Sequence, residues 1–285
     1  MAALTPSFRP LAALVAAALE EDLGDGDRTT LWTVPEGARA RARVVAKAPG
    51  VIAGTAAAVE VFRQLDPHIC AEIVCADGTG VHTGEVVLRI SGAARAILSG
   101  ERTALNFLQR LSGIATLARR FVAAVEGTGA RILDTRKTTP GWRALEKAAV
   151  RAGGADNHRT GLYDMVLLKE NHLAIAGGIA SALDRVRARN RGRLPVAVEV
   201  RSMAEVAEAL GAGAERLLLD NMSVDELREA VHSARAKPGV TVEASGKVSL
   251  ERVRAVAATG VDFISVGALT HSAPALDLSL LIDLE

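Results

Sequence analysis

The chain has 285 residues, of which 49% are hydrophobic and 24% charged, and its formal net charge is +1. This length allows one large domain or two medium ones, and the near-neutral balance argues against a general nucleic-acid or membrane-surface partner. Aromatic residues make up only 3%, so we expect aliphatic cores, as in parallel sheets covered on both faces. No apolar run approaches the length of a membrane span. Cys70 and Cys75 have neither disulfide nor metal-ligand spacing, so we expect free thiols and a cytoplasmic location.

The first part of the chain, residues 1–112, predicts an α/β sandwich domain. An amphipathic helix is expected between Pro10 and Gly24, and the acidic residues at its end distinguish it from a signal peptide. Residues 101–125 carry an apolar stripe typical of a long helix, although Gly113 argues against one unbroken helix. Alternating apolar residues and turn signals predict strands over 39–47, 69–75 and 81–90, with a helix over 56–65.

Residues 113–272 show short apolar strand patterns that alternate with helical patterns. This alternation predicts a parallel α/β barrel with one active face. There are fewer strand patterns than the eight of a full barrel, so we expect an incomplete, six-stranded barrel. The last residues, 273–285, lie beyond it and are expected to return to the first domain. Strands are predicted over 131–134, 165–168, 196–198, 216–219, 240–243 and 261–266, and helices near 142–152, 177–190, 202–211, 223–235 and 249–259.

Charged and glycine-rich segments follow these predicted strands. Because the barrel interior needs apolar packing, we expect charge to be excluded there and to gather at the mouth. A guanidinium group can bind a carboxylate or phosphate with two parallel hydrogen bonds, and glycines let the backbone approach a phosphate. The pattern therefore predicts a polyanionic substrate. The candidate site residues are Thr135, Arg136, Lys137, His158, Arg159, Lys169, Glu199, Asp220, Ser245, Gly246, Lys247, Val266, Gly267 and Ala268.

Several of these residues allow more than one interpretation. Glu199 and Asp220 could hold Mg²⁺ through water while the ion binds substrate phosphates, or they could form plain salt bridges. Lys169 could instead be a Schiff-base amine, which predicts an aldolase-like reaction. His158 lies beside Arg159 in a glycine-rich loop, which favours a functional role although a lone histidine is usually structural.

Residues 101–272 resemble the quinolinate phosphoribosyltransferase family. The matching stretches, in the family's order, are ERTALNFLQRLSGIAT (101–116), DTRKTTPG (134–141), AVRAGGADNHRTGL (149–162), LLKENH (167–172), VEV (198–200), LLDNM (218–222), EASGK (243–247) and VDFISVGALTHS (261–272). The resemblance implies a sandwich domain followed by a partly open α/β barrel. It also implies that quinolinate reacts with phosphoribosyl pyrophosphate, assisted by Mg²⁺, to give nicotinate mononucleotide, pyrophosphate and carbon dioxide in de novo NAD synthesis.

The resemblance further implies roles for the matching residues. Around the quinolinate carboxylates and nearby phosphates it places Arg102, Arg136, His158, Arg159 and Lys169. On the phosphoribosyl and magnesium side it places Lys137, Glu199 and Asp220, and at a phosphate Ser245, Gly246 and Gly267. Arg102 would reach the active site of a neighbouring subunit, which implies at least a homodimer. The catalytic roles are expected for Lys137, Lys169, Glu199 and Asp220.

The chain departs from the family pattern at two notable positions. Trp142 stands where the family commonly has a smaller aliphatic residue, and Lys247 stands where glycine is frequent. Neither departure removes a charged residue of the expected site. Two other classes of function stay open: a Schiff-base lyase that uses Lys137 or Lys169, and an anion-sensing protein without turnover.

Overall fold

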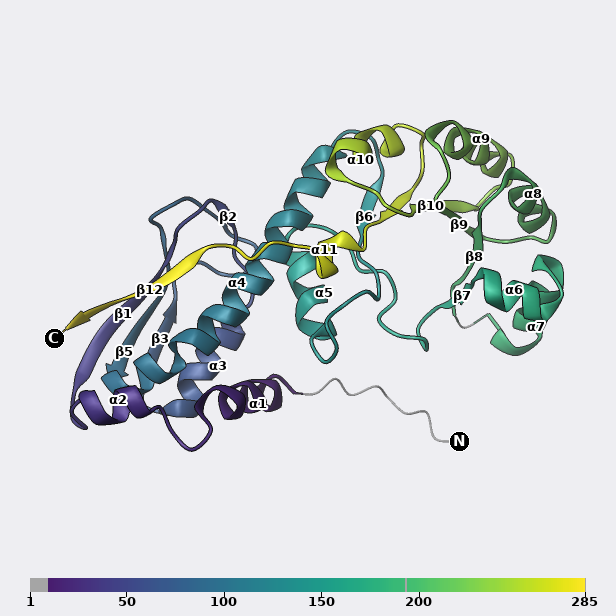
Figure 1. Cartoon of the computed structure of the whole chain (residues 1–285). Helices are drawn as coiled ribbons and strands as arrows, with labels where there is room; N and C mark the ends of the chain where they lie inside the picture. The colour runs from purple at the N-terminus through teal and green to yellow at the C-terminus, as the bar shows by residue number, and fades with distance from the viewer. Residues whose placement is uncertain (1–9, 193, 285) are drawn as a thin grey trace. The chain divides into compact units, whose positions relative to one another are not determined.

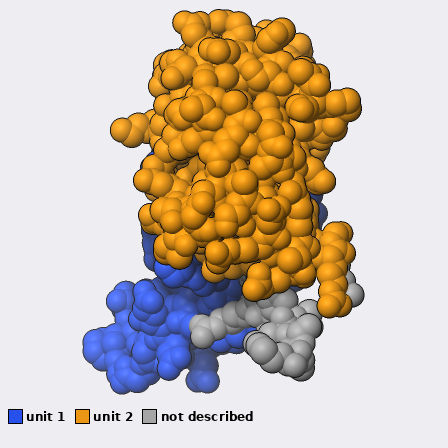
Figure 2. Space-filling model, turned by 90° about the vertical axis from the view of Figure 1, so that its right-hand side faces the viewer, with its two compact units in different colours: residues 1–119, 138–154, 272–285 blue, residues 120–137, 155–271 orange. Residues whose placement is uncertain are grey.

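The computed structural model describes residues 10–192 and 194–284, which form two compact units (Figure 2). Unit 1 contains the described residues up to Arg119, residues 138–154 and the segment from Ser272. Unit 2 contains residues 120–137 and 155–271. Residues 113–119 and 138–154, which the sequence pattern assigns to the barrel domain, therefore belong to unit 1.

An antiparallel sheet is the framework of unit 1, with the strand order β12 (Leu278–Leu284), β1 (Arg39–Ala46), β5 (Val86–Ala93) and β3 (Cys70–Ile73). The alternate residues Ala40, Ala42 and Val44 of β1 are buried, as the alternating pattern predicts. They join an aliphatic core with residues of the helices that cover the sheet (Figure 1). The remaining elements of this unit are α1 (Leu11–Leu23), α2 (Arg28–Thr33), α3 (Thr55–Leu65), α5 (Arg143–Ala152) and the strand pair β2 (Gly50–Val51) and β4 (Gly80–Val81).

The long helix α4 (Ala94–Ala124) is unbroken and begins before residue 101, where the sequence pattern predicts its start. Gly113 does not interrupt it, so the predicted long helix is confirmed. A Cβ atom at Gly113 would lie 2.0 Å from the carbonyl oxygen of Pro274, so glycine is needed for the close approach of that chain. On the same helix, Phe107 stacks on Trp142 with 4.6 Å between the ring centroids. The unusual tryptophan is therefore a packing residue of unit 1.

Six parallel strands are the framework of unit 2, in the spatial order β6 (Arg131–Leu133), β11 (Phe263–Ser265), β10 (Thr241–Ser245), β9 (Arg216–Asp220), β8 (Val196–Val200) and β7 (Val166–Leu168). No pairing joins β6 to β7 in the described part of the chain, so the barrel is incomplete, as the sequence predicts. Helices lie along the outer side of the strands (Figure 1). They are α7 (Ile179–Asn190), α8 (Met203–Gly211), α9 (Val224–Arg235) and α10 (Leu250–Ala257).

The structure differs from the sequence prediction around the helix after β7. A short helix, α6 (Glu170–Ala176), precedes α7 and was not expected. The backbone N–H of Lys169 donates to His172 Nδ1 at 3.0 Å, which helps to start this helix directly after the strand. Serine residues cap α8 and α9 at their N-termini, because Ser202 and Ser223 each accept the N–H three residues later at 3.3 Å. Ser249 makes no such bond at α10.

Two further expectations concern the whole chain. Cys70 is exposed and Cys75 half-buried, and both are free thiols, as the sequence predicts. Within the described residues, no helix combines the length and the apolarity that crossing a membrane requires.

Candidate active site

A cavity of about 710 Å³ opens in unit 2 where the carboxyl ends of the six strands meet. Parallel strands bring their carboxyl ends to one edge, so side chains distant in the sequence come together there. The cavity gathers most of the residues that the sequence singles out. Those that line it are Thr135, Arg136, Lys137, His158, Arg159, Lys169, Glu199, Asp220, Ser245, Gly246, Lys247, Gly267 and Ala268.

Two of the expected residues are not in this lining. Val266 is only 2% exposed, and its N–H donates to the carbonyl of Leu133 at 2.9 Å. Its backbone donor is therefore already used within the barrel, and a role of Val266 in substrate binding stays a prediction. Arg102 belongs to unit 1, where its side chain is exposed on α4. The sequence pattern places Arg102 near the start of the long helix, but α4 begins earlier, at Ala94.

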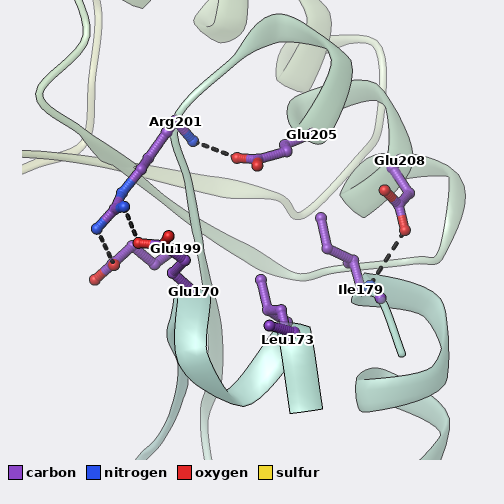
Figure 3. Close-up of a pocket in the computed structure, with 9 residues that line it drawn as sticks. Glu170, Leu173, Ile179, Glu199, Arg201, Glu205 and Glu208 are labelled. Carbon is purple, nitrogen blue, oxygen red and sulfur yellow. Dashed lines mark hydrogen bonds and ion pairs between the residues drawn. The ribbon is translucent and has the colours of Figure 1, made fainter. Parts of the chain in front are cut away.

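Glu199 and Asp220 lie inside β8 and β9, and both contact Arg201. Arg201 Nη2 is 3.5 Å from Glu199 Oε1, and its Nε is 3.4 Å from Asp220 Oδ2. The other oxygen of Glu199, Oε2, is 3.5 Å from Lys169 Nζ. Arg201 also pairs with Glu170 (Figure 3). Desolvation alone would lower the pKa of Arg201, but the three carboxylates outweigh it and raise the pKa above its ordinary value.

Arg201 is a cavity residue that the sequence reasoning missed. The sequence does contain a signal that could have found it, because Arg201 follows Glu199 by two residues and alternate strand residues share a face. Glu199 and Arg201 also line a neighbouring cavity of about 290 Å³, whose acidic wall includes Glu205 and Glu208 (Figure 3). There the backbone N–H of Arg201 donates to Glu205 Oε2 at 2.6 Å, which fixes the backbone after β8.

The residues that could hold a metal ion are few. In the described ranges 10–192 and 194–284, no group of three or more His, Cys, Asp or Glu side chains is placed to bind an ion. Magnesium is commonly bound by one or two carboxylates together with waters and substrate phosphates. Glu199 and Asp220, side by side at the mouth and bridged by Arg201, fit that mode of binding. They do not form a site that protein ligands alone would complete.

The loop after β10 has a backbone shape that requires glycine. Gly246 has φ +99°, and an added Cβ would lie 2.3 Å from Asn221 Oδ1 and 2.8 Å from Asn221 N. Lys247 follows with φ 40°, also in the left-handed region, which explains why glycine suits this position. The side chain of Lys247 is exposed and lines the cavity. Asn221, which the sequence reasoning missed, thus determines how this loop passes the end of β9.

The loop after β6 and the turn after β11 support each other. Thr270 Oγ1 donates to the carbonyl of Lys137 at 2.8 Å. A Cβ at Gly267 would lie 3.1 Å from Lys137 Cδ, so the glycine leaves room for the lysine side chain. Buried Asp134 accepts the amide of Asn157 at 2.6 Å and the N–H of His158 at 2.8 Å. These bonds set the path of the loop that presents His158.

Charge is also present inside the barrel, which corrects the expectation that it gathers only at the mouth. Glu243 in β10 is fully buried and lines the floor of the cavity. It contacts His158, Arg216 and Ser265. Burial alone would raise the pKa of Glu243, but the hydrogen bond from His158, the charge of Arg216 and the bond from Ser265 outweigh it and lower the pKa.

Arg159 occupies a partly buried place at the same end of the cavity. Its Nη1 donates to the carbonyl of Met165 at 3.3 Å. Burial lowers the pKa of Arg159 below its ordinary value, and the nearby positive charge of Arg136 acts in the same direction. Two guanidinium groups held close together create a local positive potential. The arrangement is suited to an anion with more than one negative group.

Comparison with known proteins agrees with this architecture. The family models described as the quinolinate phosphoribosyl transferase N-terminal and C-terminal domains match residues 27–112 and 114–281. The carboxylating nicotinate-nucleotide pyrophosphorylase of rice chloroplasts is 44% identical over 96% of this chain and 78% of its own length. A probable enzyme of that name from Bacillus subtilis is 43% identical over 91% of this chain and 89% of its length.

Solved structures give the same result. The nicotinate-nucleotide pyrophosphorylase of Francisella tularensis superposes with a TM-score of 0.91 at 40% identity and covers 96% of each chain. NadC from Streptococcus pyogenes gives 0.92 at 35% identity over 99% of this chain and 100% of the other. Both halves of the chain are thus matched in sequence and in fold. The chain belongs to the quinolinate phosphoribosyltransferase family.

Proposed function

We propose that this protein transfers the phosphoribosyl group of phosphoribosyl pyrophosphate to quinolinate with loss of carbon dioxide. The products are nicotinate mononucleotide, pyrophosphate and carbon dioxide, a step in de novo NAD synthesis. The single observation that carries this proposal is the cavity of unit 2, in which Arg136, Lys137, Arg159 and Lys169 face the same space as two carboxylates. Two substrates that together carry two carboxylates and several phosphates need such a set of cations.

The cavity supports the chemistry through electrostatics. The bond from the anomeric carbon to pyrophosphate breaks, and the quinolinate nitrogen forms a new bond to that carbon. Positive charge develops on the ribose and negative charge on the departing pyrophosphate. Fixed cations such as Lys137 would stabilise the leaving group, and Glu199 and Asp220 would stabilise the sugar cation. The positive charge of the ribosylated ring nitrogen then stabilises the electron pair that carbon dioxide leaves on the ring carbon, and that carbon takes up a proton.

We propose Mg²⁺ as the cofactor, held through water by Glu199 and Asp220. Bound there together with substrate phosphates, the ion would neutralise charge on the leaving group. Arg201 contacts both carboxylates at 3.4–3.5 Å and keeps them side by side. Its positive charge, together with that of Lys169, offsets the repulsion between the two carboxylates.

A direct assay tests this proposal. Purified protein would be mixed with quinolinate and phosphoribosyl pyrophosphate, with and without Mg²⁺, and pyrophosphate and nicotinate mononucleotide would be measured. We expect both products in equal amounts and a rate that depends on Mg²⁺. Binding of both substrates without products would instead indicate an anion-sensing protein. Trapping of a substrate on Lys137 or Lys169 by borohydride would indicate a Schiff-base reaction.

We further propose a cytoplasmic homodimer in which Arg102 completes the neighbouring subunit's active site. The exposed position of Arg102 on α4 and the family membership support this arrangement. Arg102→Ala and Lys137→Ala should each be nearly inactive alone. In a mixed dimer one of the two sites would contain both intact residues, so subunit exchange should restore a fraction of the activity. Background activity in mixed dimers confirmed by mass analysis would show that Arg102 does not act across subunits.

A further inference from the structure

A buried carboxylate in the barrel interior has no role in the reaction described above. Glu243 lies in the middle of β10, and its side chain is 0% exposed. Ser265 Oγ on the neighbouring strand β11 donates to Glu243 Oε1, and the other oxygen, Oε2, contacts His158 and Arg216. A buried charge of this kind is costly unless it is paired and hydrogen-bonded. The chain therefore maintains several partners around this one group.

Arg216 provides the opposite charge from the start of β9. Its Nη2 is 2.6 Å and its Nε is 3.1 Å from Glu243 Oε2. The guanidinium carbon also lies 4.5 Å from the centroid of the Phe263 ring. Two hydrogen bonds and a ring contact hold the guanidinium in one orientation. Because Arg216, Leu218 and Asp220 are alternate residues of one strand, Arg216 lies beneath the cavity floor on the same face.

The same carboxylate oxygen binds His158. His158 Nε2 is 3.3 Å from Glu243 Oε2, and the histidine side chain is only 7% exposed. The backbone N–H of Arg159 donates to His158 Nδ1 at 3.1 Å. Nδ1 is therefore an acceptor, which places the ring proton on Nε2, directed at Glu243. The pair of bonds fixes both the tautomer and the orientation of the ring.

His158 and Arg159 line both the active-site cavity and a smaller cavity of about 230 Å³ that Arg216 and Phe263 also line. The unit formed by Arg216, Glu243 and His158 therefore lies between the two spaces. Arg216 does not line the active-site cavity, and it is connected to that cavity by its contact with Glu243, which in turn contacts His158. The phosphate loop at Ser245 and Gly246 has a separate support in Asn221.

We propose that Arg216 is a positioning residue for the pyridine dicarboxylate acceptor, and that it acts by holding Glu243 against His158. This inference rests on the proposed function, because it needs quinolinate as the ligand near His158 and Arg159. Without the guanidinium, Glu243 would be a buried carboxylate with His158 as its strongest remaining partner. The carboxylate would then favour a ring protonated at both nitrogens, so Nδ1 could no longer accept the Arg159 N–H. The orientation of the ring would change, and the acceptor would bind more weakly. The phosphoribosyl donor, held elsewhere in the cavity, would be little affected.

The main test is Arg216→Met, which keeps most of the aliphatic stem and removes the charge. We expect KM for quinolinate to rise about tenfold or more, the factor that corresponds to losing a hydrogen bond to a charged group. KM for phosphoribosyl pyrophosphate should stay within about twofold of the parent. The double variant Arg216→Met with Glu243→Gln should recover most of the quinolinate affinity. A neutral glutamine needs no counter-charge, yet its side-chain oxygen can still accept the His158 Nε2–H.

Arg131→Met is the matched control. Arg131 also lies near the Phe263 ring, at 5.9 Å, and it pairs with Asp156 at 2.8 Å. Its side chain is 61% exposed, however, and an exposed pair contributes little. Both KM values should stay within about twofold of the parent in this variant. A large effect in Arg131→Met would show that any charge lost beside Phe263 matters, and would overturn the specific role of Arg216.

A spectroscopic measurement on the unliganded protein gives an answer that does not depend on turnover. Imidazole ¹⁵N–¹H correlation spectra should show His158 as a single Nε2–H tautomer in the parent, with the signal assigned by its absence in His158→Gln. Arg216→Met should show the His158 ring protonated at both nitrogens, and the double variant the single Nε2–H tautomer again. If the parent consumes quinolinate and Arg216→Met matches it in both KM values and in the spectra, the inference is wrong while the proposed function stands. Failure of the parent to use quinolinate would refute the proposed function instead.

Discussion

Substituting alanine for Gly246 tests how rigidly the loop after β10 is held. Gly246 has φ +99°, a region that costs an L-residue roughly 1–2 kcal/mol. The new Cβ would also lie 2.3 Å from Asn221 Oδ1 and 2.8 Å from Asn221 N. The amide side chain can rotate away, but the backbone nitrogen is fixed by its bond to the Ser245 carbonyl at 3.0 Å. Forcing atoms into packed space adds about 1–3 kcal/mol, so the total loss should be roughly 2–5 kcal/mol.

Gly84→Ala is the matched control for this substitution. Gly84 has φ +92°, and an added Cβ there would meet nothing within 4 Å. This variant should lose only the backbone term of roughly 1–2 kcal/mol. Denaturant unfolding followed by circular dichroism measures both losses, and their difference isolates the Asn221 contact. KM for phosphoribosyl pyrophosphate should rise only in Gly246→Ala. Equal stability losses in the two variants would refute the close contact and with it this account of the loop.

Three further predictions concern charge. Glu199→Ala and Asp220→Ala should both reduce turnover and weaken the response to Mg²⁺ in initial-rate titrations, and parental behaviour in both would make them plain salt-bridge residues. Nicotinate, with one carboxylate, should not replace quinolinate, because it lacks the second carboxylate that half-buried Arg136 and Arg159 could bind. A hydrogen bond to a charged group contributes roughly 1.5–3 kcal/mol, and comparable turnover would contradict this. Asp164 accepts the N–H groups of Thr160 at 2.6 Å and Gly161 at 3.1 Å. Burial alone would raise the pKa of Asp164, but these bonds hold it below the ordinary 3.8. Asp164→Asn should therefore lower the free energy of unfolding above that pH, and the difference should shrink as the pH falls through the lowered pKa; a pH-independent difference would exclude this cause.

The barrel of unit 2 is predictable from the sequence because its strands are short, apolar and regularly separated by helices. A parallel strand covered on both faces reads as a continuous apolar run, so positions such as 216–219 stand out. The rule that carboxyl ends of parallel strands meet at one edge then brings Lys169 and Asp220 to the same cavity without knowledge of the coordinates. The ends of the strands and the candidate ligand-binding residues can therefore be predicted from the sequence.

The contacts among these candidate residues are harder to predict from the sequence. Arg201 and Asn221 are not candidates from the sequence pattern, because Arg201 follows the predicted strand 196–198 by three residues and Asn221 follows the predicted strand 216–219 by two. Arg201 touches Glu199 and Asp220 because it shares a strand face with the first and reaches across to the second. The need for glycine at Gly246 likewise depends on Asn221, which is distant in sequence. Such pairs depend on which side chains can reach one another, and periodicity alone carries no information on that.

The buried charge in the barrel interior shows a more general limit. An apolar strand with a single acid, such as the one around Glu243, can be read as a strand whose end reaches solvent, or as a strand with an internal charge. Burial without a partner would be too costly, so the second reading requires a cation on a neighbouring strand at a matching height. Arg216 at the start of β9 satisfies this, since β9 and β10 are paired, with Glu243 opposite Leu218. A single charged residue in an apolar strand therefore indicates a buried ion pair when the neighbouring strand has a single opposite charge two residues before the position that pairs with it. Applied to this chain, that rule finds the interior pair from the sequence once the strand order is known, and it separates interior charges from those at the mouth.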